Sequence, residues 1–251
     1  MYVKRREEIL TALKGTPTLS VRDLSDGLKV SEMTIRRDLA KMEAEGVVQR
    51  YFGGVRASDL PLLQQATNVR ASSMTQAKRR IAAKAASLVG DGDAVILDCG
   101  TTILELSRLL VQRPITIVTS YLLIASMQQR INATIHLSGG ELFDQYKIMI
   151  GRKAEEFYEG INCKYAFLSA AGLHVKRGVT EYTGDEAALK RVMLEHAKTR
   201  VLLMDSSKFG VIQTFQAVEL GKIDILITDK KPPKEYMTLL KKNGVEVIVA
   251  Q

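Results

Sequence analysis

The sequence predicts an α/β protein in which a small amino-terminal winged helix-turn-helix precedes a larger α/β domain. The first observation is a set of short helical stretches followed by a glycine-bearing hairpin before residue 58. The second is a series of short apolar runs that alternate with helical stretches after Asp91. The third is the length of 251 residues, which fits one small domain and one of typical size. We expect the helix-turn-helix at residues 1–58, a basic connector at 59–90 and the larger domain at 91–251.

Three helices are expected before the hairpin. The first lies at residues 4–15, where apolar side chains share one helical face. The second, at 21–28, and the third, at 32–45, follow Ser20 and Ser31, whose hydroxyls can cap the free amides of a helix. The apolar side chains of the third helix that are expected to pack inward are Met33, Ile35, Leu39 and Met42.

The exposed face of the third helix offers side chains that suit DNA. Arginine can bond the O6 and N7 acceptors of guanine, threonine can meet a thymine methyl or a phosphate, and lysine neutralises backbone charge. The residues of this face are Thr34, Arg36, Arg37 and Lys41. After them, strands at 47–51 and 55–56 flank a turn that contains Gly53 and Gly54, which indicates a wing. A generic helix-turn-helix of this kind leaves ordinary packing and DNA binding equally open.

The charge balance favours a polyanionic or phosphorylated partner. The formal net charge is +8, and residues 61–90 hold five basic side chains and no acidic one. A solvated helix face explains that basic stretch equally well. Cys99 and Cys163 stand far apart, and with three scattered histidines they form no zinc signature, so we expect no metal. We also expect a cytoplasmic protein, because no leader and no membrane-spanning segment is recognisable.

The larger domain is expected to be a mostly parallel sheet covered by helices on both faces. Its strands are predicted at the apolar runs 94–97, 115–118, 134–137, 165–168, 201–204, 223–227 and 245–249. In such sheets a ligand binds outside the carboxyl ends of the strands. The first of these ends leads from Asp98 through Gly100 into a helix at 103–110, whose free amides can bind a phosphate.

Neither a Walker loop nor a GxGxxG motif follows this strand, so we expect neither ATP nor NAD as a cofactor. Small, hydroxylated or charged residues collect at the same edge: Thr101, Thr102, Thr119, Ser120, Gly139, Gly140, Gly172, Asp205 and Lys208. A sugar phosphate would suit them, although strand termination and helix capping explain each one singly. Lys190, Arg191 and Glu186 are expected to form a charge cluster on a helix surface.

Residues 30–39 read Val-Ser-Glu-Met-Thr-Ile-Arg-Arg-Asp-Leu and are followed by Glu43, Gly46, Arg50 and the Gly53-Gly54 pair. This pattern closely resembles the DeoR family of bacterial transcriptional repressors, and the resemblance extends to the loop 98–102, Gly139-Gly140, 178–180 and 205–208. It covers nearly the whole chain.

The resemblance implies roles for individual residues. Ser31, Thr34, Arg36 and Arg37 would lie on the recognition helix, and Arg50 with the Gly53-Gly54 turn would form the wing. The larger domain would be related to ribose-5-phosphate isomerase and hold a phosphorylated sugar effector. The residues expected to hold the effector are Gly100, Thr101, Thr102 and Lys208, while Asp98, Glu181 and Asp205 would bond sugar hydroxyls or orient the lysine.

The function expected on these grounds is that of a transcriptional repressor of a carbohydrate-utilisation operon, which is no enzyme. Its partners would be double-stranded operator DNA, a phosphorylated sugar and further copies of the chain in a dimer or tetramer. Coupling between the domains is expected to pass through the connector around residues 78–80. The alternative is a phosphosugar isomerase with an appended DNA-binding module, and a third hypothesis is sequence-indifferent nucleoid binding.

Overall fold

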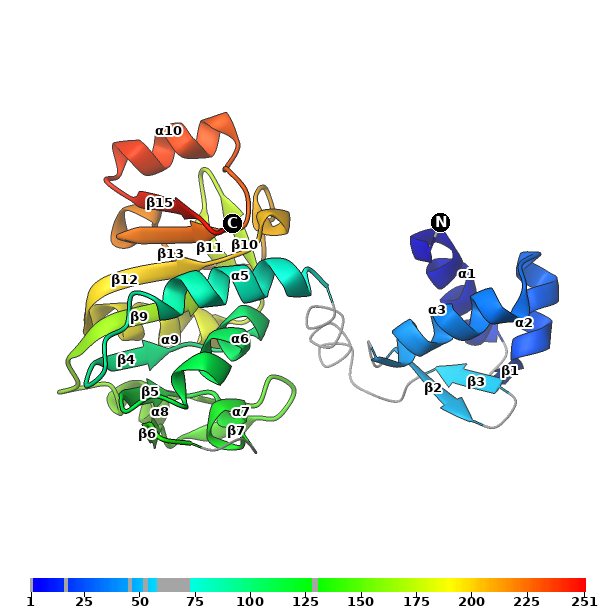
Figure 1. Ribbon diagram of the computed structural model, residues 1–251, viewed down its shortest axis with the longest axis horizontal. Coiled ribbons are helices and arrows are strands. Elements are labelled where there is room, and N and C mark those ends of the chain that lie inside the picture. Colours follow the sequence, from blue (N-terminus) through cyan, green and yellow to red (C-terminus); the bar gives the residue numbers. More distant parts are fainter. Residues whose placement is uncertain (1, 16–17, 45–46, 52–53, 58–72, 128–130) are drawn as a thin grey trace. The chain divides into compact units, whose positions relative to one another are not determined.

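The computed structural model describes residues 2–15, 18–44, 47–51, 54–57, 73–127 and 131–251 (Figure 1). The chain divides into two compact units, an amino-terminal unit at 1–73 and a carboxy-terminal unit at 74–251.

The amino-terminal unit combines three helices with a small antiparallel sheet in the part that the structure describes. Its elements are α1 (Tyr2–Gly15), β1 (Thr18–Ser20), α2 (Val21–Leu28), α3 (Glu32–Ala44), β2 (Val48–Tyr51) and β3 (Gly54–Ala57). The strand order is β1-β3-β2, and β2 with β3 forms the predicted wing. The sequence analysis predicts no strand at 18–20, but Leu19 pairs with Val55 there. A strand of three residues carries too little periodicity to be recognised without its partner.

Both predicted helix caps are confirmed. The Ser20 hydroxyl accepts a hydrogen bond from the Asp23 amide at 3.0 Å, and the Asp23 carboxylate accepts one from the Ser20 amide at 3.2 Å. This reciprocal pair satisfies two amides at the start of α2. The Ser31 hydroxyl accepts a hydrogen bond from the Thr34 amide at 3.3 Å, so α3 also begins at a capped turn.

The core of the amino-terminal unit corrects one prediction. Ile35, Leu39 and Met42 are fully buried, as the spacing along α3 predicts. Met33 is 69% exposed, so its predicted inward packing is wrong. The reason is helical periodicity, because Met33 lies two residues before Ile35 and therefore faces away from it.

The carboxy-terminal unit is built on a seven-stranded parallel sheet. Its strands, in chain order, are β4 (Ala94–Leu97), β5 (Thr116–Thr119), β6 (Thr134–Leu137), β9 (Cys163–Ser169), β12 (Ala197–Leu203), β14 (Ile225–Thr228) and β15 (Glu246–Val249). Every neighbouring pair is parallel, and each strand overlaps one predicted apolar run. The predicted fold class is therefore confirmed.

Helices cover both faces of this sheet (Figure 1). They are α5 (Thr75–Ala86), α6 (Thr101–Leu110), α7 (Leu122–Ala125), α8 (Arg152–Glu156), α9 (Gly184–Glu195) and α10 (Lys234–Lys242), with single 3₁₀ turns η1 (Ser206–Lys208) and η2 (Leu220–Lys222). Two smaller antiparallel sheets, which the sequence analysis does not predict, complete the unit. They are β7 (Glu141–Phe143) with β8 (Ile148–Ile150), and β10 (Gly172–His174) with β11 (Gly178–Glu181) and β13 (Phe215–Val218).

The strand order β15-β14-β12-β9-β4-β5-β6 places a reversal between β4 and β9. After β4 the chain moves outward through β5 and β6, and then it resumes on the other side of β4 at β9. In parallel sheets the connections leave a crevice at such a reversal, beside the carboxyl ends of the two strands. The loop that begins at Asp98 and the residues that follow Ser169 lie at this point.

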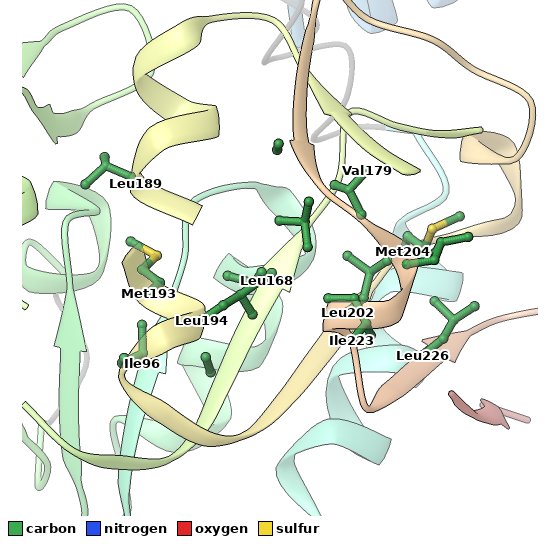
Figure 2. Close-up of a cluster of buried hydrophobic side chains, with 14 of the residues drawn as sticks. Ile96, Leu168, Val179, Leu189, Met193, Leu194, Leu202, Met204, Ile223 and Leu226 are labelled. Carbon is green, nitrogen blue, oxygen red and sulfur yellow. The ribbon is translucent and has the colours of Figure 1, made fainter. Parts of the chain in front are cut away.

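The side chains of the central strands alternate between the two faces of the sheet. Figure 2 shows the cluster on one face, where Ile96, Leu168 and Leu202 pack with Met193 and Leu194 of α9. Intervening residues on the same strands are fully buried as well, namely Val95, Leu97, Phe167, Val201 and Leu203. Burial on both faces explains why these strands read as unbroken apolar runs.

Part of the predicted connector belongs to the carboxy-terminal unit. Helix α5 packs against α6, with Ile81 and Ala85 fully buried and Lys78 only 3% exposed. Assigning residues 74–90 to a separate connector is therefore wrong, because an amphipathic helix in that stretch buries its apolar side on this unit. The remainder of the connector, at 59–72, lies outside the described residues.

Because each unit has its own core, a cavity made in one unit should destabilise that unit and leave the other unchanged. Replacing Leu39 by Ala should lower the free energy of unfolding of the amino-terminal unit by about 2–5 kcal/mol, since a fully buried leucine leaves a cavity. The matched Leu202→Ala change should act on the carboxy-terminal unit instead. Hydrogen exchange followed by peptide mass spectrometry checks this, and equal acceleration of exchange in both units by Leu39→Ala would contradict it.

Candidate DNA-binding surface and effector site

The predicted DNA-facing residues of helix α3 differ in their exposure and in their contacts with other residues. Arg36, Arg37 and Lys41 are exposed, and Thr34 is half-buried. The Arg36 guanidinium lies 3.1 Å from the Glu32 carboxylate one turn earlier. No hydrogen bond or ion pair joins Arg37 to another residue that the structure describes. Arg37 therefore offers its guanidinium fork to a ligand without first breaking such a contact.

Other residues of this surface have structural partners. The Ser31 hydroxyl lies 2.9 Å from that of Thr34, and the Lys41 ammonium lies 4.9 Å from the centre of the Tyr2 ring. On the wing, the Arg50 amide donates to the Glu43 carboxylate at 3.1 Å.

The Arg50 guanidinium also lies 3.6 Å from the same Glu43 carboxylate, which joins the wing to the end of α3. Gly54 begins β3, where it pairs with Tyr51, and Gly53 lies outside the described residues. The predicted DNA contacts of all these residues stay predictions.

Asp38 connects α3 to α1 through the interior of the unit. Its side chain is 4% exposed, and it accepts a hydrogen bond from the Arg5 guanidinium at 2.7 Å. This ion pair lies on the face of α3 that the core covers. It fixes the rotation of α3, so that the opposite face stays turned to the solvent.

In the carboxy-terminal unit, a buried ion cluster occupies the crevice beside β4 and β9. The Asp98 carboxylate accepts hydrogen bonds from the Ser169 amide at 2.9 Å and from the Lys190 ammonium. The same ammonium lies 3.3 Å from the Glu181 carboxylate, which also accepts from the Ala171 amide at 3.3 Å. Two of the predicted effector-binding residues, Asp98 and Glu181, are therefore brought together.

Lys190 lies in the interior of the carboxy-terminal unit and not on a helix surface as predicted. Its side chain is 1% exposed and Glu186 is 5% exposed, so their prediction as surface charges is wrong, whereas Arg191 is exposed. A signal was present in the spacing, because residues 186, 190 and 193 share a helical face with apolar neighbours. That face packs into the core, where an ammonium needs the carboxylates to compensate its burial.

The ion cluster shifts the pKa values of its members. Burial raises the pKa of Glu181 to about 7, against the opposing effect of Lys190. Burial lowers the pKa of Lys190, but the nearby carboxylates of Asp98 and Glu181 outweigh it and hold that pKa well above its ordinary value. One ammonium cannot compensate the charges of two buried carboxylates, so burial favours the protonated form of Glu181.

The loop after β4 has a geometry that requires glycine. Gly100 has φ +117°, and a Cβ there would lie 2.5 Å from the Ser169 hydroxyl oxygen. That hydroxyl donates to the Cys99 carbonyl at 2.8 Å, which ties the loop to the end of β9. Gly100 caps α6, so the first amides of this helix lie next to the ion cluster, with Thr101 half-buried and Thr102 buried.

Several other predicted effector-binding residues already have structural roles. The Thr119 hydroxyl donates to the Leu97 carbonyl at 2.7 Å and accepts from the Tyr121 amide at 3.0 Å. The Ser120 hydroxyl lies 2.9 Å from both the Tyr158 and the Ser138 hydroxyls.

Three more of the predicted effector-binding residues have structural roles, two through a close approach to the backbone and one as a helix cap. A Cβ on Gly140 would lie 2.6 Å from the Ile150 carbonyl oxygen, and one on Gly172 would lie 2.4 Å from that of Val211. Asp205 caps η1 by accepting a hydrogen bond from the Ser207 amide at 3.0 Å. Gly139 is exposed, and Lys208 is half-buried. Contact of any of these residues with an effector stays a prediction.

The crevice is nearly closed. The recess at the ion cluster measures about 10 Å³, which is room for about one water molecule. It is lined by Asp98, Cys99, Ser120, Tyr121, Ile148, Glu186, Leu189 and Met193. Within the described ranges, no three His, Cys, Asp or Glu side chains are grouped so that they could hold a metal ion. None of the helices in the described part of the chain is long and apolar enough to span a membrane.

The pKa of Glu181 predicts a pH dependence of stability. Because the folded-state pKa of about 7 lies above the ordinary value of 4.5, the folded state binds more protons than the unfolded state between these values. The free energy of unfolding should therefore fall as the pH rises through this window. Glu181→Gln keeps an acceptor oxygen and should flatten that dependence in thermal unfolding followed by circular dichroism. Glu195→Gln, an exposed change at the end of α9, is the control, and equal slopes for the wild type and Glu181→Gln would contradict the assignment.

Comparison with known proteins shows relatives along the whole chain. A putative aga operon transcriptional repressor of Escherichia coli O157:H7 is 32% identical over 250 residues, which covers 98% of this chain and 93% of the relative. The transcriptional repressor GlcR of Bacillus subtilis is 31% identical over 253 residues, covering 100% of this chain and 98% of the relative. Among solved structures, ribose 5-phosphate isomerase A of Methanocaldococcus jannaschii matches with 19% identity, 55% coverage of each chain and a TM-score of 0.39.

Two family models divide the sequence between them. The DeoR-like helix-turn-helix domain matches residues 5–59, and the DeoR C-terminal sensor domain matches residues 73–230. The first match contains the capped helices and the wing, and the second contains six of the seven strands of the parallel sheet and the buried ion cluster. This chain belongs to the DeoR family of helix-turn-helix transcriptional regulators.

Proposed function

We propose that this chain represses a carbohydrate-utilisation operon. A phosphorylated sugar, bound at the carboxyl edge of the parallel sheet, changes the affinity of the chain for operator DNA. The observation that carries the proposal is the junction of β4 and β9. There the loop 98–102 leads into the free amides of α6 beside buried Asp98, Glu181 and Lys190. Helix amides suit a phosphate, and paired carboxylates and an ammonium suit sugar hydroxyls.

The relatives support the regulatory half of this proposal. The Escherichia coli relative is named as a putative repressor of the aga operon, and GlcR is named as a transcriptional repressor. Both are matched along nearly their whole length. We infer the same class of activity for this chain, with operator DNA as its partner.

A regulator rather than an isomerase is the better inference for the carboxy-terminal unit. Proton transfer at a sugar carbon needs a base within reach of the substrate. Glu181 and Asp98 instead share the Lys190 ammonium, and the recess that Asp98 lines has room for about one water molecule. The proposed ligand is therefore bound and released unchanged, and its binding requires the crevice to widen.

The proposed mechanism is thermodynamic linkage between the two units. A sugar phosphate that prefers one arrangement of the protein shifts the population toward that arrangement and changes operator affinity accordingly. We further propose that the chain acts as a dimer or tetramer, because one short recognition helix reads few base pairs.

The test uses the full chain with a duplex selected from a randomised pool, at one fixed salt concentration. Operator affinity is measured while a panel of sugar phosphates is added, and each compound is assayed for chemical conversion. The proposal expects one compound to change operator affinity without being converted. Catalytic turnover would establish the isomerase alternative, and equal affinity for selected and scrambled duplexes would establish sequence-indifferent binding.

Arg37 should contribute to operator specificity. Replacing it by Ala should weaken binding to the selected duplex by about 1–3 kcal/mol if its free guanidinium reads a base edge. Binding to a scrambled duplex should change less. Fluorescence anisotropy with both duplexes checks this, and an equal loss on both would assign Arg37 to the phosphate backbone instead.

Lys208 should contribute to effector binding. Removing its charge with Lys208→Met should raise the sugar phosphate concentration needed for half of the change in operator affinity by about tenfold or more, because a hydrogen bond to a charged group contributes about 1.5–3 kcal/mol. Operator affinity without the compound should not change. Lys222→Met, on η2, is the matched control. A dose response of Lys208→Met equal to that of the wild type would remove Lys208 from the site.

A further inference from the structure

Met33 is an apolar side chain that the fold leaves in the solvent. Its exposed fraction of 69% exceeds that of every other large apolar side chain in the described part of the protein. Ile212 follows with 53% and Leu109 with 45%. Single exposed apolar side chains are common on protein surfaces, so exposure alone assigns no role. The position of Met33 supplies the further evidence.

Met33 cannot turn into the core, because the orientation of α3 is fixed from the other side. Ile35 and Leu39 are fully buried, and Asp38 holds Arg5 across the interior at 2.7 Å. Ser31 caps the helix two residues before Met33. The outward direction of the Met33 side chain is therefore a property of the folded unit.

The neighbours of Met33 on the helix surface are two arginines. Residues three and four apart on a helix lie next to each other, which places Arg36 and Arg37 beside Met33. All three side chains are exposed and lie in the first two turns of α3. In a helix-turn-helix protein, the amino-terminal residues of the second helix contact base edges in the major groove.

The chemistry of a thioether limits what Met33 can contact there. The side chain is apolar and flexible, and its sulfur is only a weak hydrogen-bond acceptor. The apolar group that the major groove offers is the C5-methyl of thymine. Guanine, which the flanking arginines suit, presents only acceptors at its edge.

We propose that Met33 is a specificity-determining residue that packs against the methyl group of a thymine adjacent to the bases or phosphates contacted by Arg36 and Arg37. The inference rests on the proposed operator binding and adds a base preference to it. It accounts for a large apolar side chain on a surface that is otherwise polar and charged.

The experiment removes the thymine methyl group and the Met33 side chain separately. A duplex is selected from a randomised pool by the full wild-type chain, and each thymine is then replaced in turn by deoxyuridine, which lacks only the methyl group. Affinities are measured at one salt concentration for the wild type, Met33→Ala and Leu109→Ala. The last variant loses an exposed apolar side chain from α6 of the other unit and is the matched control.

At one thymine per half-site, deoxyuridine should weaken wild-type binding about threefold to fivefold, the effect expected for one buried methyl group. Met33→Ala should bind the thymine duplex more weakly by at least a similar factor and be indifferent to deoxyuridine at that position. Such non-additivity identifies a direct contact. Leu109→Ala should behave like the wild type.

Three results would overturn the inference. Equal sensitivity of the wild type and Met33→Ala to deoxyuridine at every position would show that no thymine methyl depends on Met33. Wild-type affinity of Met33→Ala for the thymine duplex would show the same. If the wild type selects no preferred sequence at all, the proposed operator function fails together with this inference, whereas the first two results leave that function intact.

Discussion

The carboxy-terminal unit depends on one buried ammonium, that of Lys190, which lies between the carboxylates of Asp98 and Glu181. It joins α9 to the ends of β4 and β11, and Asp98 in turn holds the Ser169 amide at the end of β9. Losing one member of a buried ion pair typically costs about 3–5 kcal/mol, so these elements cannot separate without a replacement partner. A ligand that enters this crevice must supply polar groups that substitute for the existing ones. The contacts of Lys190 with Asp98 and Glu181 hold these elements together, and they are also the contacts that a ligand in the crevice would have to replace.

The architecture could be predicted because its signals are local. The inner strands β4, β5, β9, β12 and β14 bury apolar side chains on both faces, so each contains a short apolar run. Ser20 and Ser31 precede their helices directly, so the caps are readable from neighbouring residues. The strand at 18–20 and the two small antiparallel sheets could not be predicted in this way, since they are short and their pairing depends on distant segments. Met33 is an apolar residue near the start of α3 that is exposed, because its angular position on the helix differs from that of Ile35. Apolar character alone therefore does not predict which side chains of this helix are buried.

The candidate effector site was predicted only as a collection of residues at one sheet edge. The resemblance to the DeoR family places Asp98, Gly100 and Glu181 there, but the sequence gives no indication that Lys190, 92 residues after Asp98, pairs with the two carboxylates. It also cannot show which hydroxyls are already engaged, as Thr119 and Ser120 are. For Gly140 and Gly172, close approaches by carbonyl oxygens account for the absence of a side chain. Thr119, Ser120, Gly140 and Gly172 therefore have structural roles, and contact of an effector with the loop 98–102 or with the ion cluster stays a prediction.

Linkage between the two units can be measured by calorimetry of the sugar phosphate with and without saturating operator duplex. Thermodynamic reciprocity requires that DNA change the affinity for the effector by the same factor by which the effector changes the affinity for DNA. Linkage predicts two different dissociation constants for the sugar phosphate, whose ratio equals the shift in operator affinity. One dissociation constant, unaffected by saturating DNA, would contradict the claim and reduce the carboxy-terminal unit to a binding domain without influence on the helix-turn-helix.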